Sequence, residues 1–314
     1  MRGRAYGAAA ASALIWGLSF LFTKRALGVL TTFQLLGGRF LLAAGSMVLL
    51  AALRVIRVNL TWPKLKLLLP VALLQPIVYF LCETAGVRLV TTAEAGIMIA
   101  LVPVAVSLCA ALLLGERLRP LHWASVLLSV AGAAVMAAQG LGGQGGNRLL
   151  GYLALLGAVV AAGLFNPLVK RASAVATSVE TTFVMMAVGA VVFPAVGVVQ
   201  AAAAGEVGAF FAGMFPREAI GSLVYLGVVS SVLAFLCQNW AIARLSPSVV
   251  GTFVNLTPVV TVLAGVLANG ERLATLQYVG AALIFVGIWG ATRGHGKAAA
   301  AQAAEAPADT GLPG

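Results

Sequence analysis

The sequence predicts an all-α integral membrane protein whose ten transmembrane helices form an inverted repeat of two five-helix halves. The first observation is composition. Of the 314 residues, 61% are hydrophobic and 9% are charged, against roughly 45–50% and about 25% in soluble domains. The mean hydropathy of +1.03 agrees. The second observation is a series of long apolar stretches, and the third is a repeated sequence pattern. Most of the surface must therefore face lipid.

Apolar stretches of suitable length follow one another along the chain. A bilayer core about 30 Å thick needs about 20 helical residues. Charged and Gly/Pro-rich breaks give ten expected helices, at residues 6–22, 32–53, 67–87, 93–114, 121–139, 150–169, 178–200, 220–243, 249–268 and 276–292. The first resembles a secretory signal, but it lacks a convincing cleavage site and runs directly into Lys24 and Arg25. We interpret it as the first helix.

The basic residues predict the orientation. With a cytoplasmic N-terminus, thirteen Lys and Arg residues fall in cytoplasmic segments, and six fall in outer segments. The six are Lys24, Arg25, Arg88, Arg148, Arg217 and Arg272. This bias predicts a multi-pass protein of the cytoplasmic membrane with both termini in the cytoplasm. Residues 294–314, rich in Ala and Gly, are expected to be a disordered cytoplasmic tail.

An internal repeat reveals the organisation. A shift of 155 residues matches Gly96 with Gly251, Pro103 with Pro258, Trp123 with Tyr278, Gly132 with Gly287, and the GERL sequence at 115–118 with that at 270–273. Near the start of each half, a shift of 146 matches Lys24 with Lys170. Each half holds five helices, an odd number, so the halves must cross the membrane in opposite directions.

The repeat sets the expected domains. Residues 1–139 and 150–293 are the two five-helix repeats, and residues 140–149 are a Gly-rich linker between them. The linker matches GxGxxG from Gly140 to Gly145, but no strand precedes it. We therefore interpret it as a flexible spacer and not as a nucleotide site.

Several motifs resemble the EamA domains of the drug/metabolite transporter (DMT) superfamily. They are Trp16-Gly17, Arg39-Phe40, the duplicated proline followed by GERL, and an aromatic residue and then a glycine in the next helix. The resemblance covers about residues 5–293. It implies a ten-helix secondary transporter in which helices 1, 3, 4, 6, 8 and 9 line a central cavity, with metabolites or drugs usually exported. Glu83 departs from the commonest family pattern.

Polar residues inside the third helix are candidates for the substrate pathway. Gln75, Tyr79 and Glu83 are spaced by four and share one helix face. Arg39, in the second helix, lies at a depth that permits an ion pair with Glu83. Such a pair either fixes two helices together or serves substrate binding or proton coupling.

The first helix carries a polar stripe formed by Ser12, Trp16, Ser19 and Thr23. A stripe of this kind either lines a cavity or forms hydrogen bonds between helices. We include Trp16 and Ser19 in the expected substrate pathway.

The ninth helix places Thr252 and Asn255 just before Pro258. Pro258, like Pro103 in the fourth helix, leaves the carbonyl four residues earlier without its usual donor. The duplication favours a hinge at both prolines, and Thr252 and Asn255 as pathway residues.

Three amides complete the candidate pathway. Gln238 and Asn239 occupy the positions that Glu83 and Thr84 occupy in the first half. Asn166 precedes a proline near the end of the sixth helix, where it either faces the pathway or simply ends the helix. Elsewhere, Glu94 is expected to cap a helix after Thr91 and Thr92, and Glu271 in GERL to hold backbone or an arginine.

The residue inventory excludes most enzyme chemistry. The chain has one aspartate, Asp309, and two histidines, His122 and His295. Aspartyl dyads and Ser/His/Asp triads are therefore excluded, no phosphate-binding loop is present, and we expect neither enzymatic activity nor a cofactor. Single and paired basic residues between apolar stretches give no nucleic-acid footprint.

The sequence favours a secondary transporter, an exporter of small metabolites such as amino acids or aromatic and drug-like compounds, working by alternating access. Its expected partners are the substrate and the lipid bilayer, without nucleic acid, and its expected state is a monomer or weak homodimer. A channel-like facilitator and a non-transporting membrane scaffold remain alternatives, because neither needs titratable groups.

Overall fold

The structure, a computed structural model, describes residues 2–114, 120–138, 146–245, 250, 253–287 and 289. In these ranges the chain forms helices joined by short turns and contains no strand. Six helical runs of the described ranges are long and apolar enough to cross a bilayer, and four further apolar helices are shorter. The chain is therefore an all-α membrane protein, as predicted.

The long runs include two that are built from consecutive segments. They are α1 (Arg2–Ala26), α2 (Thr32–Ala52), α3 (Trp62–Ala72) with η1 (Leu73–Val78) and α4 (Tyr79–Leu89), α8 (Gly146–Ala172), α9 (Ser178–Ala203), and α11 (Arg217–Val224) with η3 (Tyr225–Leu233) and α12 (Ala234–Arg244). The four shorter apolar helices correspond to α5 (Thr92–Ile99) with the start of α6 (Val102–Leu114), to α7 (Pro120–Ala138), to α14 (Leu256–Asn269), and to a last helix, Thr275–Gly287. A further short helix is α10 (Val207–Ala212).

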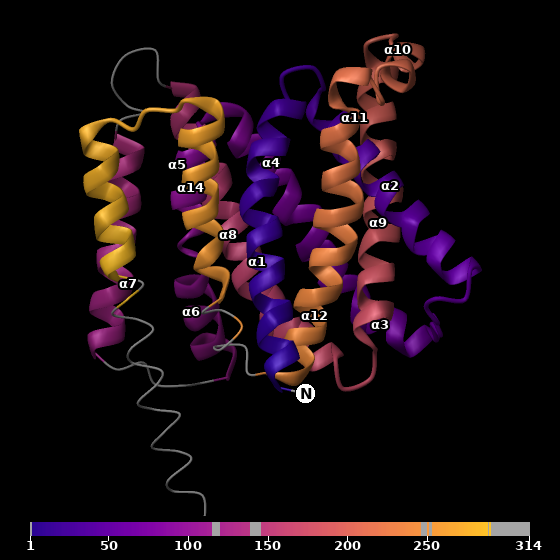
Figure 1. The fold of residues 1–314 in the computed structure, drawn as a ribbon, viewed down its shortest axis with the longest axis horizontal. Coiled ribbons are helices and arrows are strands. Elements are labelled where there is room, and N and C mark those ends of the chain that lie inside the picture. Colours follow the sequence, from indigo (N-terminus) through magenta and orange to yellow (C-terminus); the bar gives the residue numbers. More distant parts are fainter. Residues whose placement is uncertain are drawn as a thin grey trace, which may run out of the picture.

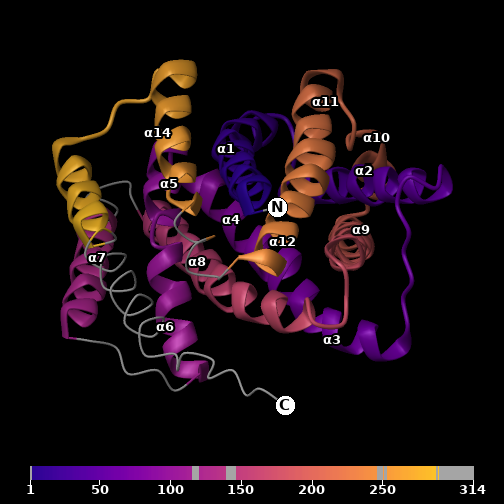
Figure 2. The same cartoon turned by 60° about the horizontal axis from the view of Figure 1, so that its bottom comes forward.

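The helix α1 lies between α14 on one side and α11 and α12 on the other (Figures 1 and 2). On the far side of α12, α2 packs along α9, and behind α1 the helix α8 contacts both α4 and α6. The last helix stands beside α7 at one edge of the bundle in both views. Elements of both halves thus meet around α1.

The two helices α1 and α8 run in opposite directions. Lys24, in the last turn of α1, donates to the carbonyls of Val87 and Val90 at 2.8 and 2.6 Å, which places the end of α1 beside the end of α4. Glu94, four residues after Val90, accepts a hydrogen bond from Arg148 in the first turn of α8 at 2.6 Å. The end of α1 and the start of α8 are therefore on the same side of the bundle.

The contact of Lys24 has a counterpart at the other end of the bundle. Lys170, in the last turn of α8, donates to the carbonyls of Ile242 and Leu245 at 3.1 and 3.3 Å. These partners are the residues that the 155-residue shift matches with Val87 and Val90. The same lysine-to-carbonyl contact thus holds the end of a helix in each half.

Two glycines show the same correspondence. A Cβ atom on Gly17 of α1 would lie 2.5 Å from the Cβ of Val260 in α14. A Cβ atom on Gly163 of α8 would lie 2.9 Å from the Cβ of Ala105 in α6. Only glycine permits helices to approach this closely, and the two pairs correspond under the repeat shifts.

Two of the long runs are interrupted by π-helical segments. Within η1, Gln75 has extended backbone angles (φ −143°, ψ 109°) and is followed by Pro76. The second segment, η3, contains Ser230, which the repeat matches with Gln75. Such segments open the backbone ladder and are frequent at functional sites.

The predicted proline kinks take a different form. Pro103 is the second residue of α6, which starts after a turn at Ala100 and Leu101. Pro258 is the third residue of α14, which starts after a turn at Asn255. The prolines therefore stand in the first turn of a new helix, where the missing N–H costs nothing, and not within a continuous bent helix.

Candidate functional site: a cavity between the halves

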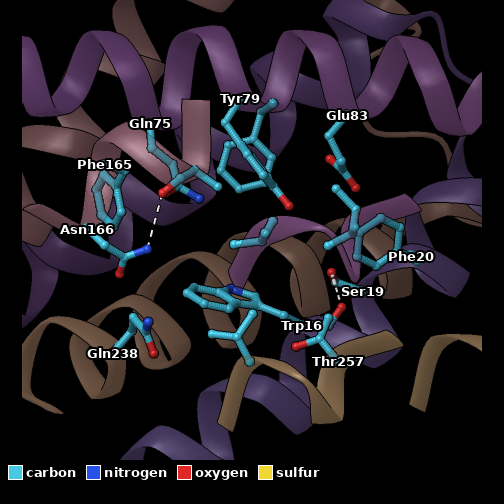
Figure 3. Close-up of a pocket in the computed structure, with 15 residues that line it drawn as sticks. Trp16, Ser19, Phe20, Gln75, Tyr79, Glu83, Phe165, Asn166, Gln238 and Thr257 are labelled. Carbon is cyan, nitrogen blue, oxygen red and sulfur yellow. Dashed lines mark hydrogen bonds between the residues drawn. The ribbon is translucent and has the colours of Figure 1, made fainter. Parts of the chain in front are cut away.

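A cavity opens between α1, η1, α4, α8 and α12 (Figure 3). The segments on either side of the breaks before α6 and α14 complete its described wall. The space that protein atoms leave empty there, including the part open to the outside, measures about 580 Å³. Its described lining consists of Trp16, Ser19, Phe20, Gln75, Tyr79, Phe80, Glu83, Ile99, Val102, Ala162, Phe165, Asn166, Gln238, Val254 and Thr257. The wall is thus mostly apolar and aromatic, with a few polar groups, as in many small-molecule sites.

Seven of the residues predicted to line a substrate pathway stand in this wall: Trp16, Ser19, Gln75, Tyr79, Glu83, Asn166 and Gln238. In the view of Figure 3 the amides of Gln75, Asn166 and Gln238 lie at one end of the cavity. Glu83 and Ser19 lie at the other end, and the rings of Trp16 and Tyr79 stand between. The cavity therefore has two polar ends and an aromatic middle.

Glu83 is the one acidic residue in the described cavity wall. Its side chain is on α4 and the residue is only 2% exposed. One carboxyl oxygen, Oε2, has no hydrogen-bond partner. A buried carboxylate oxygen without a hydrogen-bond partner is energetically costly, so this oxygen is the atom of the site that a bound donor would stabilise.

The ion pair between Glu83 and Arg39 that the sequence permits is not formed. The ion pairs between described residues are Lys64 with Glu180 and Arg148 with Glu94. Depth along two helices allows such a pair, but it does not fix the direction in which a long side chain turns.

Arg39 turns instead towards η3. Its Nε donates to Ser231 Oγ at 2.7 Å and its Nη2 donates to Ser230 Oγ at 3.1 Å. The guanidinium also lies 4.1 Å from the centre of the Phe80 ring. Arg39 is 0% exposed and is not in the described cavity wall. It fastens α2 to η3.

The polar stripe of α1 serves both functions that the sequence left open. Trp16 and Ser19 line the cavity, and Trp16 Nε1 donates to the carbonyl of Ser230 at 3.2 Å. Ser12 donates to Gln238 Oε1 at 3.0 Å, a bond between helices. Thr23 is buried, and its hydroxyl has no partner. The stripe therefore lines the cavity in its middle and binds a neighbouring helix near its start.

Like Arg39, the predicted pathway residues Asn239 and Asn255 are not in the described wall. Asn239 is buried, and its Nδ2 donates to Thr182 Oγ1 on α9 at 2.9 Å, away from the described wall. Asn255 stands at the turn before α14, and Thr252 falls outside the described residues. Asn166 does line the cavity, and its Nδ2 donates to the carbonyl of Ala162 at 3.1 Å.

Sequence reasoning missed the residues with apolar or small side chains in the wall: Phe20, Phe80, Ile99, Val102, Ala162, Phe165, Val254 and Thr257. Most of them are ordinary core residues by type, so polarity gives no signal for them. Their positions within the repeat provide one. Six pairs of wall residues are related by the shifts of 146 or 155: Trp16 with Ala162, Ser19 with Phe165, Phe20 with Asn166, Glu83 with Gln238, Ile99 with Val254, and Val102 with Thr257.

A second polar cluster joins the halves at the end of the bundle that holds Lys24. Glu94 forms the predicted capping box with Thr91, and its Oε1 also accepts from Arg148, Tyr152 and Gln277. Glu271 caps the same helix from the other half. Its two oxygens accept from the backbone N–H groups of residues 92 and 93 at 3.0 and 2.8 Å. Both carboxylates satisfy backbone donors at the start of α5.

No group of three His, Cys, Asp or Glu side chains within the described part of the chain is placed to hold a metal ion.

Comparisons with known proteins agree with the geometry. An uncharacterized transporter, YcxC of Bacillus subtilis, is 31% identical over 91% of this chain and 92% of its own length. A probable terminal-alkyne amino-acid exporter of Streptantibioticus cattleyicolor is 31% identical over 63% of each chain. A solved crystal structure superposes with a TM-score of 0.61 over 92% of this chain and 98% of its own, at 24% identity, which shows a shared fold.

The sequence model of the EamA-like transporter family matches residues 3–138 and 149–293. This match takes in nearly all of the helices described above. The chain is a multi-pass membrane protein that belongs to the EamA-like transporter family.

Proposed function

We propose that this protein is a secondary transporter that exports small, partly apolar metabolites, such as amino acids or aromatic compounds, by alternating access. The observation that carries the proposal is the composition of the cavity wall. Its six pairs of repeat-related residues centre the cavity between residues 1–139 and residues 150–293. A site on the axis between two inverted halves is the arrangement that lets one chain expose it to either side in turn.

The inverted repeat is supported by the opposed directions of α1 and α8 and by the matched contacts of Lys24 and Lys170. We propose residues 140–149 as the linker between the halves. Residues 294–314 are proposed as the cytoplasmic tail, in a protein of the cytoplasmic membrane.

The breaks before α6 and α14 supply the movable elements. Ile99 and Val102 flank the first break and line the cavity, and Val254 and Thr257 flank the second and do the same. A change of angle at either break therefore changes the cavity wall directly. The cavity and the family favour transport over catalysis.

The test is export of metabolites. We expect cells that lack the protein to retain a small set of metabolites that cells expressing it release. Purified protein in proteoliposomes should then carry those metabolites with saturable flux and counterflow. Flux without saturation or counterflow would identify a channel-like facilitator. Absence of flux with every retained metabolite would contradict the proposal and favour a non-transporting membrane scaffold.

A further inference from the structure

Glu83 is the one residue with a formally charged side chain in the described cavity wall. No Lys, Arg or His is part of that described wall. The neighbouring Arg39 donates to Ser230 and Ser231 and lies over Phe80, so its hydrogen bonds go to η3 and not to Glu83. Arg39 Nη1 also lacks a hydrogen-bond partner, and the Arg39 charge is close enough to act on Glu83, but no hydrogen bond joins the two groups. Oε2 of Glu83 therefore remains an acceptor without a donor among the described residues.

The wall around this acceptor suits a positive charge on an apolar body. Five aromatic side chains belong to the described cavity wall: Trp16, Phe20, Tyr79, Phe80 and Phe165. Aromatic faces attract cations, and more strongly where water is excluded. An anion would meet both the Glu83 carboxyl and the negative faces of these rings.

We propose that the cavity binds a protonated organic amine, with its ammonium group on Glu83 and a flat apolar body between Trp16 and Tyr79. The inference rests on the proposed function, because it names the chemical class of the transported compound. Figure 3 shows the separation that this requires, with Glu83 at one end and the amides of Gln75, Asn166 and Gln238 at the other. The amides can bind a neutral polar group at the far end of the same compound.

Binding of four probes that share a phenyl ring tests this on the unaltered protein in detergent, by titration calorimetry. The probes are 2-phenylethylamine, the neutral 2-phenylethanol, the anion 3-phenylpropionate, and phenylalanine. We expect 2-phenylethylamine to bind about tenfold or more tightly than 2-phenylethanol, the ratio typical of a hydrogen bond to a charged group. Phenylalanine should lie between the amine and the anion. Equal binding of amine and alcohol, tighter binding of the anion, or no binding of the amine at millimolar concentration would each overturn the proposal.

Variants locate the ammonium group. Glu83→Gln keeps the shape of the side chain and removes the charge, so amine affinity should fall about tenfold or more while affinity for 2-phenylethanol stays within about twofold. The control is Glu218→Gln, the same change at an exposed glutamate of α11, which should alter neither affinity. Glu83→Asp serves if Glu83→Gln does not fold, because it keeps the charge and should keep the preference for amine over alcohol. Loss of that preference in Glu83→Asp, or its persistence in Glu83→Gln, contradicts the assignment.

The binding experiment and the transport experiment can fail separately, so their outcomes distinguish the amine site from the proposed function. Selective amine binding without flux in proteoliposomes would contradict the transporter function and support the amine-binding site. Saturable export of neutral or anionic metabolites alone would establish the transporter and overturn the amine site.

Discussion

The two halves of the cavity wall differ much more than the frameworks that hold them. Lys24 and Lys170 make the same carbonyl contacts, and Gly17 and Gly163 allow the same close helix approach. In the wall, by contrast, the repeat matches the acidic Glu83 of the first half with the neutral Gln238 of the second.

Two further matched positions extend the contrast. Trp16 corresponds to Ala162, and Arg39 corresponds to Met185, which is also buried. Backbone geometry is thus preserved by both halves, while charge and aromatic surface are concentrated in the first. In the proposed transporter, the duplicated framework supplies the two alternative arrangements, and the unequal wall selects the compound that is bound.

The largest expected effect concerns the opposed directions on which this comparison depends. Reporter fusions ending at Ala5 and His295 should be active only in the cytoplasm, and a fusion ending at Gln144 should be active only outside. The reason is that the start of α8 lies on the side of the bundle where α1 ends. A fusion at Ala5 or His295 that is active only outside the cell would contradict the inverted repeat, and the matching of the two halves would then fail.

Next in size is the effect of making the halves alike at Glu83. In proteoliposomes, Glu83→Gln should insert and bind a neutral substrate but lose the dependence of flux on a pH gradient, because no carboxylate remains in the described wall to exchange a proton. The comparison is flux with and without the gradient for the parent, Glu83→Gln and Glu218→Gln. An unchanged response in Glu83→Gln would rule out proton coupling at this residue.

A smaller effect is expected at the two helix breaks, where the halves should be equivalent. Pro103→Ala and Pro258→Ala each restore a backbone donor and favour joining the two helical pieces. Turnover should fall about tenfold, equal to roughly 1.4 kcal/mol of barrier, while the amount of protein in the membrane stays unchanged. Parental transport rates in both variants would show that the breaks do not move.

At the framework itself we expect an effect on stability alone, with the composition of the cavity wall unchanged. Gly17→Ala should destabilise the protein by about 1–3 kcal/mol through overpacking against Val260. Gly163→Ala should cost less, because its nearest neighbour lies further away. The control is Gly7→Ala, an exposed position with nothing within 4 Å, where greater helix propensity should stabilise by up to about 1 kcal/mol. Thermal unfolding in detergent measures all three, and equal losses at Gly7 and Gly17 would contradict the close approach.

The sequence predicted those features that depend on composition and period. The apolar stretches correspond to helices, and the fourfold spacing of Gln75, Tyr79 and Glu83 does bring all three to one cavity, despite the break at Gln75. Features that depend on the direction of one side chain were not predictable. Arg39 could reach Glu83 in depth, but its partners are hydroxyls on η3.

Apolar wall residues such as Phe20 and Val102 were missed for a related reason. The same residue types serve lipid contact, core packing and cavity lining, so type alone carries no distinction. Helix breaks were anticipated at the prolines but not as separate helices, since local sequence does not show whether neighbouring turns can tilt independently.

The carboxylates of Glu94 and Glu271 have a consequence for the resting population of the protein. Separating the halves at the end of the bundle that holds Lys24 requires Glu271 to leave two backbone donors and Glu94 to part from Arg148, Tyr152 and Gln277. In the proposed alternating-access cycle, these bonds favour the arrangement closed at that end. A substrate can reverse that weighting only by binding the other arrangement more tightly, and a preference of ten thousandfold, about 5.5 kcal/mol, is needed to move a population from 1:99 to 99:1.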